Sequence, residues 1–233
     1  MSLIKIENLT KNYGKTTALN NISLTVPKGA IVGLLGPNGS GKTTLIKSIM
    51  GLLTDYEGSI FIDGLEAKEI TLADISYLPD KSHIPTWFTV TEAIKFFGDF
   101  YQDFDSKKAV EMLTSMEIPL KKKIKTLSRG TQEKVGLALI MSRRAKLYIL
   151  DEPIGAVDPA SRDFIMETII KNYNEESSIL ISSHIISDIE SVLDRAIFLK
   201  NGEVIINDYV DDIRIKYNMS LDETFREVFR NVR

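Results

Sequence analysis

Residues 36–44, GPNGSGKTT, have the residue types and the spacing of a loop that binds phosphate. Three glycines allow the backbone to curl so that its N–H groups point at an anion. Lys42 can reach the terminal phosphates and is expected to act in catalysis, and the hydroxyl of Thr43 can bind Mg²⁺. The motif therefore predicts a site for a nucleoside triphosphate and its Mg²⁺ ion. The residues expected to contact the nucleotide are Gly36, Asn38, Gly39, Ser40, Gly41, Lys42, Thr43 and Thr44.

Two acidic residues, Asp151 and Glu152, follow an apolar run that is typical of a buried strand. In a phosphate-loop hydrolase, Asp151 would hold Mg²⁺ directly or through water. Glu152 would orient and deprotonate the water that attacks the terminal phosphate. An acidic pair at a strand end can also be purely structural, but the glycine loop upstream favours the catalytic interpretation.

The elements that must position these groups predict an α/β protein. Residues 30–35 are an apolar run typical of a buried strand directly before the glycine loop, and residues 45–50 predict the start of a helix directly after it. Residues 147–150 and 178–182 are apolar runs of the kind found in central parallel strands. Further strands are expected at residues 3–9, 18–26, 59–64, 75–79, 196–200 and 203–206, with a turn at 11–15 and an Asn-Gly turn between the last two strands.

Helical patterns dominate residues 80–145. Thr89 and Glu92 form a capping box that opens a helix reaching residue 101. A second amphipathic helix is expected to turn Val110 toward the core together with its leucine and a methionine. Helices are expected at residues 106–116, 128–139, 161–173 and 185–193, and from a second capping box at Ser220 and Glu223.

The composition limits the classes of function. The chain has 233 residues, 43% hydrophobic and 26% charged, which suffices for one well-packed domain with an appendage. A net charge of −3 argues against non-specific binding of nucleic acid. The absence of cysteine excludes disulfides and thiol chemistry. The N-terminus lacks the apolar core of a signal peptide, and no apolar stretch approaches the roughly 18 residues of a spanning helix. We therefore expect a protein that is cytosolic or peripheral to a membrane.

Residues 127–132, LSRGTQ, lie shortly before the acidic pair and resemble the signature segment, usually LSGGQ, of ABC transporter ATP-binding subunits. The resemblance covers about residues 3–208. It implies that Ser128 and Gly130 bind the γ-phosphate of ATP held by a second subunit. A serine hydroxyl and the N–H groups of a helix N-terminus suit an anion, although the same residues alone could be an ordinary helix cap.

The resemblance implies a fold. The expected class is α/β, with a P-loop NTPase (RecA-like) core, an N-terminal antiparallel β subdomain and an inserted α-helical subdomain. A single domain would span residues 1–233. Its expected parts are the core and β subdomain at about 1–79 and 146–208, the helical subdomain at about 80–145, and a helical tail at about 209–233.

Three further residues match positions where the family binds nucleotide. Tyr13 resembles the aromatic residue that stacks on adenine, although a turn tyrosine packed on the sheet would look the same in sequence. His184 resembles the histidine that contacts the γ-phosphate. Asp158, in the segment 154–158, resembles a residue that supports the site of the partner subunit.

The sequence departs from the family pattern at two positions. Asp80 stands where the family has a glutamine that meets Mg²⁺ and the membrane subunit. A carboxylate can bind Mg²⁺ but cannot donate a hydrogen bond when ionised, so Asp80 is a predicted metal ligand whose coupling role is open. Arg129 replaces a signature glycine and adds a fixed cation that either favours phosphate or crowds the site. Because Glu152 and His184 are present, hydrolysis is still expected.

The resemblance also implies partners. Neither active site of such a protein is complete in one chain, so a second ATP-binding subunit is expected, in a homodimer or a heterodimer. Transport requires separate membrane-spanning subunits, which places the protein at the cytoplasmic face of the cell membrane. Trp87 and Phe88 are expected either to dock those subunits or to belong to the core of the helical lobe. No nucleic-acid partner is expected.

The expected function is ATP hydrolysis that powers transport, with export of drugs or antimicrobial or toxin-type peptides preferred over import. A non-transport ABC ATPase acting on ribosomes or DNA is the alternative from another class. Such proteins resemble tandem cassettes or carry long coiled-coil insertions, and this sequence has neither. A nucleotide kinase would leave the signature segment unexplained, and ATP-dependent dimerisation of a Glu152→Gln variant would exclude it.

Overall fold

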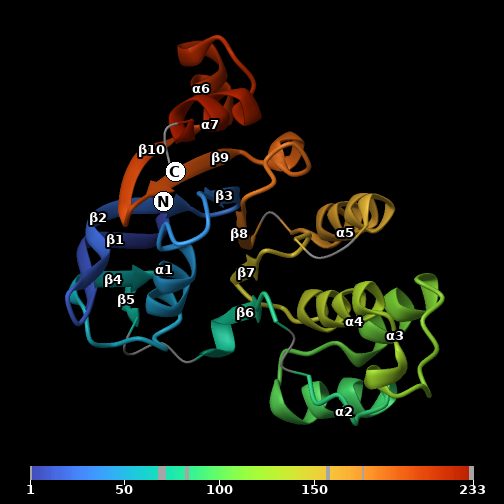
Figure 1. The fold of residues 1–233 in the computed structure, drawn as a ribbon. Coiled ribbons are helices and arrows are strands. Elements are labelled where there is room, and N and C mark those ends of the chain that lie inside the picture. Colours follow the sequence, from blue (N-terminus) through green and yellow to red (C-terminus); the bar gives the residue numbers. More distant parts are fainter. Residues whose placement is uncertain (1, 68–71, 82–83, 156–157, 175, 231–233) are drawn as a thin grey trace.

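The protein is described by a computed structural model that covers residues 2–67, 72–81, 84–155, 158–174 and 176–230 (Figure 1). Two sheets and the helices that pack against them make up this part of the chain. No helix in these ranges is long and apolar enough to cross a membrane.

The central sheet has six strands in the order β10-β9-β3-β8-β7-β6 (Figure 1). The pairs from β9 through β6 are parallel, and β10 runs antiparallel to β9. Parallel strands end at the same edge of a sheet, so the segments that follow β3, β7 and β8 are brought together. The strands are β3 (Ile31–Leu35), β6 (Ile75–Leu78), β7 (Leu147–Asp151), β8 (Ser178–Ser183), β9 (Arg195–Lys200) and β10 (Glu203–Tyr209).

A second, antiparallel sheet has the order β2-β1-β4-β5. Its strands are β1 (Ser2–Tyr13), β2 (Thr16–Pro27), β4 (Glu57–Ile62) and β5 (Leu65–Glu66). The first strand is longer than predicted: residues 11–13 continue the pairing with β2, and only Gly14 and Lys15 turn. The extended pairing carries Tyr13 to the strand's end.

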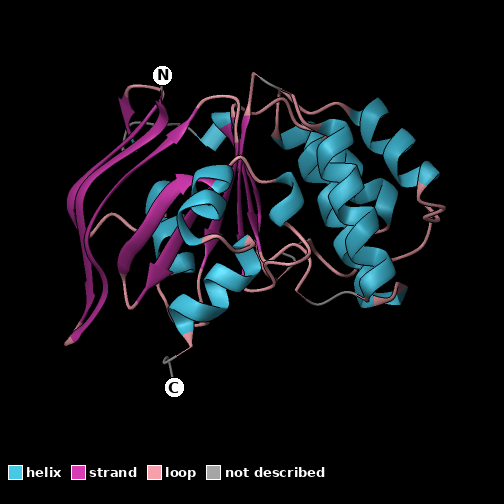
Figure 2. Cartoon of the chain, turned by 90° about the horizontal axis from the view of Figure 1, so that it is seen from above, coloured by secondary structure: helices cyan, strands magenta, loops and turns pink. Residues whose placement is uncertain are grey.

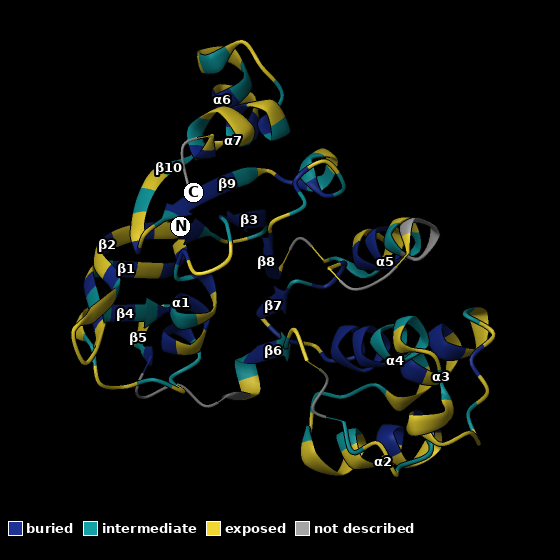
Figure 3. Cartoon of the chain, viewed as in Figure 1, coloured by how far each residue is buried: buried dark blue, intermediate teal, exposed yellow. Residues whose placement is uncertain are grey.

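Helix α1 (Lys42–Ile49) packs its apolar residues into a core shared by both sheets. Successive residues of β7 alternate between this core and a second one, because neighbouring side chains on a strand point to opposite faces. Leu147 and Ile149 belong to the core around α1, and Tyr148 and Leu150 belong to the core that the other helices share. Strands β7 and β8 are accordingly buried on both faces (Figure 3).

The helices between β6 and β7 form a lobe on the side of the central strands away from the antiparallel sheet (Figure 2). They are α2 (Val90–Phe100), α3 (Ser106–Ser115) and α4 (Arg129–Met141), with a 3-10 turn at Ile124–Thr126, and another 3-10 turn, Leu72–Asp74, precedes β6. Helix α5 (Pro159–Asn172) follows β7. Helices α6 (Val210–Tyr217) and α7 (Leu221–Phe229) close the described chain, and Phe225 and Phe229 of α7 pack on Phe198 of β9.

This architecture confirms the predicted α/β class, with a β subdomain and a helical insertion. The domain boundaries near residues 79, 145 and 208 stay predictions. Two local expectations are wrong. On α3, Met112 and Leu113 are buried as predicted, but Val110 is exposed and its neighbour Ala109 is buried in its place. Residues 185–193 form turns and one 3-10 turn, Glu190–Val192, because their spaced apolar side chains are buried by an irregular segment and not by a helix.

The capping box of α2 allows a test of local stability. Thr89 accepts a hydrogen bond from the N–H of Glu92, and the Glu92 carboxylate accepts one from the N–H of Thr89. Thr89→Ala should lower the free energy of unfolding by about 1 kcal/mol, because an N–H of the first turn loses its partner. Thr89→Ser keeps the hydroxyl and is the matched control. Equal urea midpoints for Thr89→Ala and the parent would contradict the prediction.

Candidate nucleotide-binding site

The loop after β3 has a backbone that only glycine can follow at Gly41. This residue has φ +109°, and a Cβ there would lie 2.7 Å from the carbonyl oxygen of Ala18. Helix α1 begins at the next residue, and no side chain in the described structure caps it. The N–H groups of its first turn are therefore directed at whatever lies in the loop, which is how helix N-termini bind phosphate.

Lys42 lies folded over this loop. Its ammonium donates hydrogen bonds to the carbonyl oxygens of Gly36 at 2.7 Å and Pro37 at 3.3 Å. The same nitrogen lies 3.5 Å from Oε1 of Glu152. Lys42 is buried, so its charge is placed where a terminal phosphate is expected and is balanced by the carboxylate across the site.

Asp151 and Thr43 meet at the end of β7. Thr43 Oγ1 lies 3.4 Å from Asp151 Oδ2, and the other carboxylate oxygen accepts a hydrogen bond from Ser182. One hydroxyl and one carboxylate are oxygen ligands of the kind that Mg²⁺ uses when phosphates and waters supply the rest. The described residues contain no group of three or more histidine, cysteine, aspartate or glutamate residues that could hold a metal ion.

Glu152 is held by the neighbouring strand. Its N–H donates to the carbonyl oxygen of Ser182 at 3.1 Å and to the Ser182 hydroxyl at 3.0 Å. Its backbone has φ +52°, an uncommon value for a residue with a side chain. Oε2 makes a 2.8 Å hydrogen bond with Nδ1 of His184, while Oε1 is buried without a hydrogen bond in the described structure. One carboxylate oxygen is thus available to a new partner.

Ser182 is a site residue that sequence reasoning missed. It lies opposite Asp151 in the pairing of β7 and β8, and its hydroxyl contacts both acidic residues. The signal in the sequence was present: two serines follow the apolar residues 179–181 at the end of the strand. A polar residue at the carboxyl end of a buried strand is a candidate for the site.

Asp80 lies near the same acidic group. It is exposed just beyond β6, and Tyr77 of that strand makes a hydrogen bond with Asp151. Burial, the negative charges of Asp151 and Asp80, and that hydrogen bond together raise the pKa of Tyr77 far above its usual value. Asp80 and Asp151 also line the same cleft.

These groups line one cleft with a volume of about 650 Å³. Tyr13 is among the lining residues, and 49% of its surface is exposed. Of the predicted residues, the cleft is lined by Tyr13, Asn38, Gly39, Gly41, Lys42, Thr43, Thr44, Asp80, Asp151, Glu152 and His184. Gly36 and Ser40 lie beneath its lining: the Gly36 carbonyl binds Lys42, and the carbonyl of buried Ser40 accepts a hydrogen bond from the N–H of Gly202.

The signature segment lies largely apart from this cleft. The hydroxyl of Ser128 caps α4 by accepting a 3.2 Å hydrogen bond from the N–H of Thr131. Arg129 lines the cleft and pairs with Glu133 at 3.3 Å, whereas Ser128 and Gly130 are not among the lining residues. Asp158 is exposed at the start of α5 and is also not among them, and residues 156–157 of the predicted interface segment lie outside the described residues.

In this site a phosphate loop faces an acidic strand end. Comparison with known proteins identifies the family to which the chain belongs. The family described as ABC transporter matches residues 19–155, which include the phosphate loop, the signature segment and the acidic pair. The chain belongs to the ABC transporter family. It is an ATP-binding subunit that hydrolyses ATP for transport, as the motifs predicted.

The chain is similar to ABC ATP-binding proteins over most of their length. "Lantibiotic transport ATP-binding protein SrtF" of Streptococcus pyogenes is 31% identical over 243 residues, which cover 98% of this chain and 96% of that protein. A solved "ATP binding subunit of ABC transporter" has a TM-score of 0.87 at 27% identity, covering 97% of this chain and 99% of that one. The "Bacterial ABC Transporter Cassette" MJ0796, solved as a dimer, has a TM-score of 0.77 at 27% identity, covering 88% and 98%.

Proposed function

We propose that this ABC ATPase powers export of drugs or of antimicrobial or toxin-type peptides through separate membrane-spanning subunits. Its similarity to a lantibiotic transport protein over nearly the whole of both chains supports export of peptides. Import is the alternative. The protein would then lie at the cytoplasmic face of the membrane, with the helical subdomain at about residues 80–145 between the nucleotide core and the membrane subunits.

The observation that carries the proposed chemistry is the convergence of Lys42, Glu152 and His184 on one cleft. When nucleotide binds, the Lys42 ammonium would leave the loop carbonyls for the terminal phosphates. Glu152 would then have Oε1 free to accept a proton from the attacking water. His184, which already orients Oε2 of that carboxylate, would contact the γ-phosphate with its other ring nitrogen.

The residues present suit a magnesium ion. Thr43 and Asp151 would hold it, with Asp80 as a further carboxylate near the same position. A bound Mg²⁺ would neutralise charge on the β- and γ-phosphates during phosphoryl transfer. Tyr13 would stack on the adenine at the other end of the cleft, and the backbone of residues 38–44 would bind the phosphates.

Because Ser128 and Gly130 lie outside the cleft of their own chain, we propose that they serve a second subunit. Two chains arranged head to tail would place the N-terminus of α4 on the γ-phosphate of the partner, with Asp158 near the same interface. The dimeric form of MJ0796 supports this arrangement. Both a homodimer and a heterodimer satisfy the geometry.

Light scattering on a Glu152→Gln variant tests the proposed dimer. Mg-ATP should convert the variant from monomer to dimer, because bound ATP joins the two surfaces and is hydrolysed slowly. A parent sample with Mg-ADP is the control and should stay monomeric. A variant that binds ATP but stays monomeric would contradict the homodimer. The partner that completes the site would then be a different chain.

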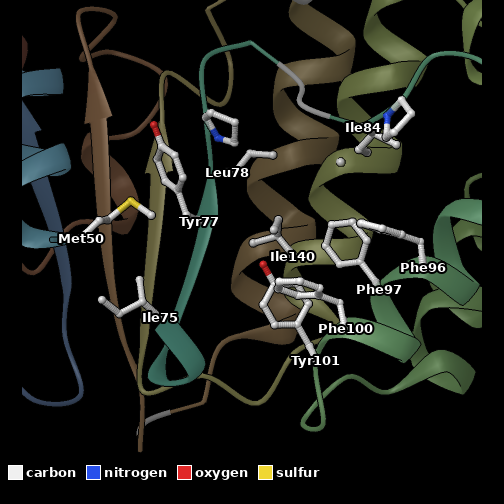
Figure 4. Close-up of a pocket in the computed structure, with 13 residues that line it drawn as sticks. Met50, Ile75, Tyr77, Leu78, Ile84, Phe96, Phe97, Phe100, Tyr101 and Ile140 are labelled. Atoms are coloured by element: carbon white, nitrogen blue, oxygen red, sulfur yellow. The ribbon is translucent and has the colours of Figure 1, made fainter. Parts of the chain in front are cut away.

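The cleft between the core and the helical lobe is the proposed docking surface for the membrane subunits (Figure 4). It has a volume of about 290 Å³, with Tyr77 and Leu78 of β6 on one wall and Phe96, Phe97 and Phe100 of α2 on the other. Phe96 and Phe100 are exposed aromatic residues, which suits an apolar partner segment. The cleft adjoins Asp80, so a docked segment would reach the nucleotide site.

The sequence left two roles open for Trp87 and Phe88: docking of the membrane subunits and packing in the core of the helical lobe. We propose docking for Trp87 and core packing for Phe88. Phe88 packs on the core of the lobe, and Trp87 is 67% exposed. Trp87→Ala should therefore weaken binding to the membrane subunits while changing the free energy of unfolding by less than about 0.5 kcal/mol. Ile215→Ala, another exposed apolar residue on α6, is the matched control. Unchanged co-purification of membrane subunits with Trp87→Ala would contradict the docking role.

The drug or peptide sensitivity of cells distinguishes export from import. A strain lacking this ATPase should become more sensitive to the exported peptide or drug, and the parent gene should restore resistance where the Glu152→Gln gene does not. A panel of lantibiotics is the first set of compounds to test. Loss of uptake of a nutrient, with unchanged resistance to every compound, would favour import.

A further inference from the structure

Lys11 is a buried lysine at the edge of the nucleotide cleft. Its relative exposure is 2%, and among the described lysines only Lys42 is buried as well. Removing an ammonium from water is costly unless it finds charged and polar partners. Lys11 has two: the carbonyl oxygen of Asp55, at 2.9 Å, and the carboxylate of the same residue, at 2.5 Å.

The third neighbour of the Lys11 ammonium is an aromatic ring. The nitrogen lies over the ring of Tyr13, 4.8 Å from its centroid. The two residues are two positions apart near the end of β1, where the pairing with β2 is irregular, and their side chains contact each other. A cation at this distance is attracted by the electron-rich face of an aromatic ring and opposes the ring's rotation away from it.

Tyr13 keeps surface for a second partner. Half of the residue is exposed, and its exposed part lines the cleft that holds the phosphate loop. The ring is thus held by the ammonium while facing the cleft. Asp55, whose carbonyl oxygen and carboxylate contact the ammonium, lies in the loop between α1 and β4.

We propose that Lys11 is a positioning residue that sets the ring of Tyr13 for stacking on the nucleotide base. The inference rests on the proposed role of Tyr13. The ammonium orients the ring and draws electron density toward itself and away from the opposite face of the ring, which favours stacking of an electron-rich purine on that face. Lys11 would therefore contribute to affinity for the base and not to affinity for the phosphates.

The test compares two ligands, Mg-ATP and Mg-tripolyphosphate, which lacks the base, by calorimetry. Lys11→Met keeps the apolar stem and removes the charge. It should weaken ATP binding by about three- to tenfold and leave tripolyphosphate binding unchanged. Lys11→Arg should restore ATP affinity. If Lys11 had only a structural role, Lys11→Met would weaken the binding of both ligands to the same extent. That result, or an unchanged affinity for ATP, would overturn the inference.

Two further variants separate the possible failures. Asp55→Asn keeps the ammonium over the ring, because the carbonyl of residue 55 still accepts its hydrogen bond, and should bind ATP as the parent does. A loss of ATP affinity equal to that of Lys11→Met would assign the effect to the loop and reject the inference. Tyr13→Leu should lose ATP affinity selectively, and Lys11→Met should add nothing in that background. If Tyr13→Leu binds ATP normally, base stacking itself is rejected, and the inference with it.

Discussion

Replacing Glu152 with glutamine is expected to slow ATP hydrolysis by about 10²–10⁴-fold, or about 3–5 kcal/mol in activation free energy, while ATP remains bound. Glutamine has the same shape and can keep a hydrogen bond to His184, but it cannot accept a proton from water. The carboxylate also pairs with Lys42, so its removal frees the ammonium for phosphate. Turnover and ATP affinity should therefore change in opposite directions. Single-turnover hydrolysis and equilibrium binding measure the two separately.

Glu190→Gln is the matched control for this experiment. Glu190 is also a partly buried carboxylate, but its partners are the N–H of Asp222 and the guanidinium of Arg214, and it is not among the residues that line the cleft. The rate of ATP turnover by Glu190→Gln should stay within about twofold of that of the parent. Unchanged turnover in Glu152→Gln would move the general base elsewhere, with His184 as the next residue to test.

Replacing Arg143 with methionine is expected to lower the free energy of unfolding by about 3–5 kcal/mol, the largest stability effect proposed for this chain. The guanidinium is 1% exposed and pairs with Asp103 at 3.1 Å. It also donates to the carbonyl oxygens of Ile75 and Ala73 and lies 3.8 Å from the ring centroid of Tyr101. Methionine fills part of the volume but leaves the carboxylate and two carbonyls without their partner. Urea unfolding measures the loss.

The next residue along the chain supplies the control. Arg144 pairs with Asp105 at 3.4 Å, but its side chain is 79% exposed. An exposed ion pair contributes about 0–1 kcal/mol, so Arg144→Met should change unfolding little. If the two variants lost equal stability, the clamp that Arg143 forms between the helical lobe and β6 would not be a main source of stability.

The sequence predicted those parts of the site whose signals are local. The glycine loop lies between a strand and a helix that are its own neighbours in the chain, so reading about twenty residues predicted both the structure and the ligand class. The caps at Thr89 and Ser220 were predicted for the same reason and are confirmed. Asp151 and Glu152 follow directly from the end of an apolar run.

Contacts between distant segments could not be predicted in this way. The role of Ser182 depends on the register of β8 against β7, which places it opposite Asp151. The ion pair between Lys42 and Glu152 depends on the order of strands in the sheet. Residues 185–193 have helical spacing, yet tertiary packing buries their apolar side chains in an irregular segment. The spacing of apolar residues therefore predicts which of them are buried, whereas the tertiary fold determines whether the segment is helical or irregular.

The hairpin between β9 and β10 has a consequence for engineering this protein. Hairpin tips are usually the safest places to insert a tag or a reporter domain. Here the N–H of Gly202 holds the carbonyl of Ser40, its own carbonyl accepts from the N–H of Asn20, and a Cβ on Gly202 would lie 2.7 Å from Ala18 O. An insertion at this tip would therefore disturb the phosphate loop directly through these contacts. The turn at Gly64, where a Cβ would meet no described atom within 4 Å, is the better site for a graft.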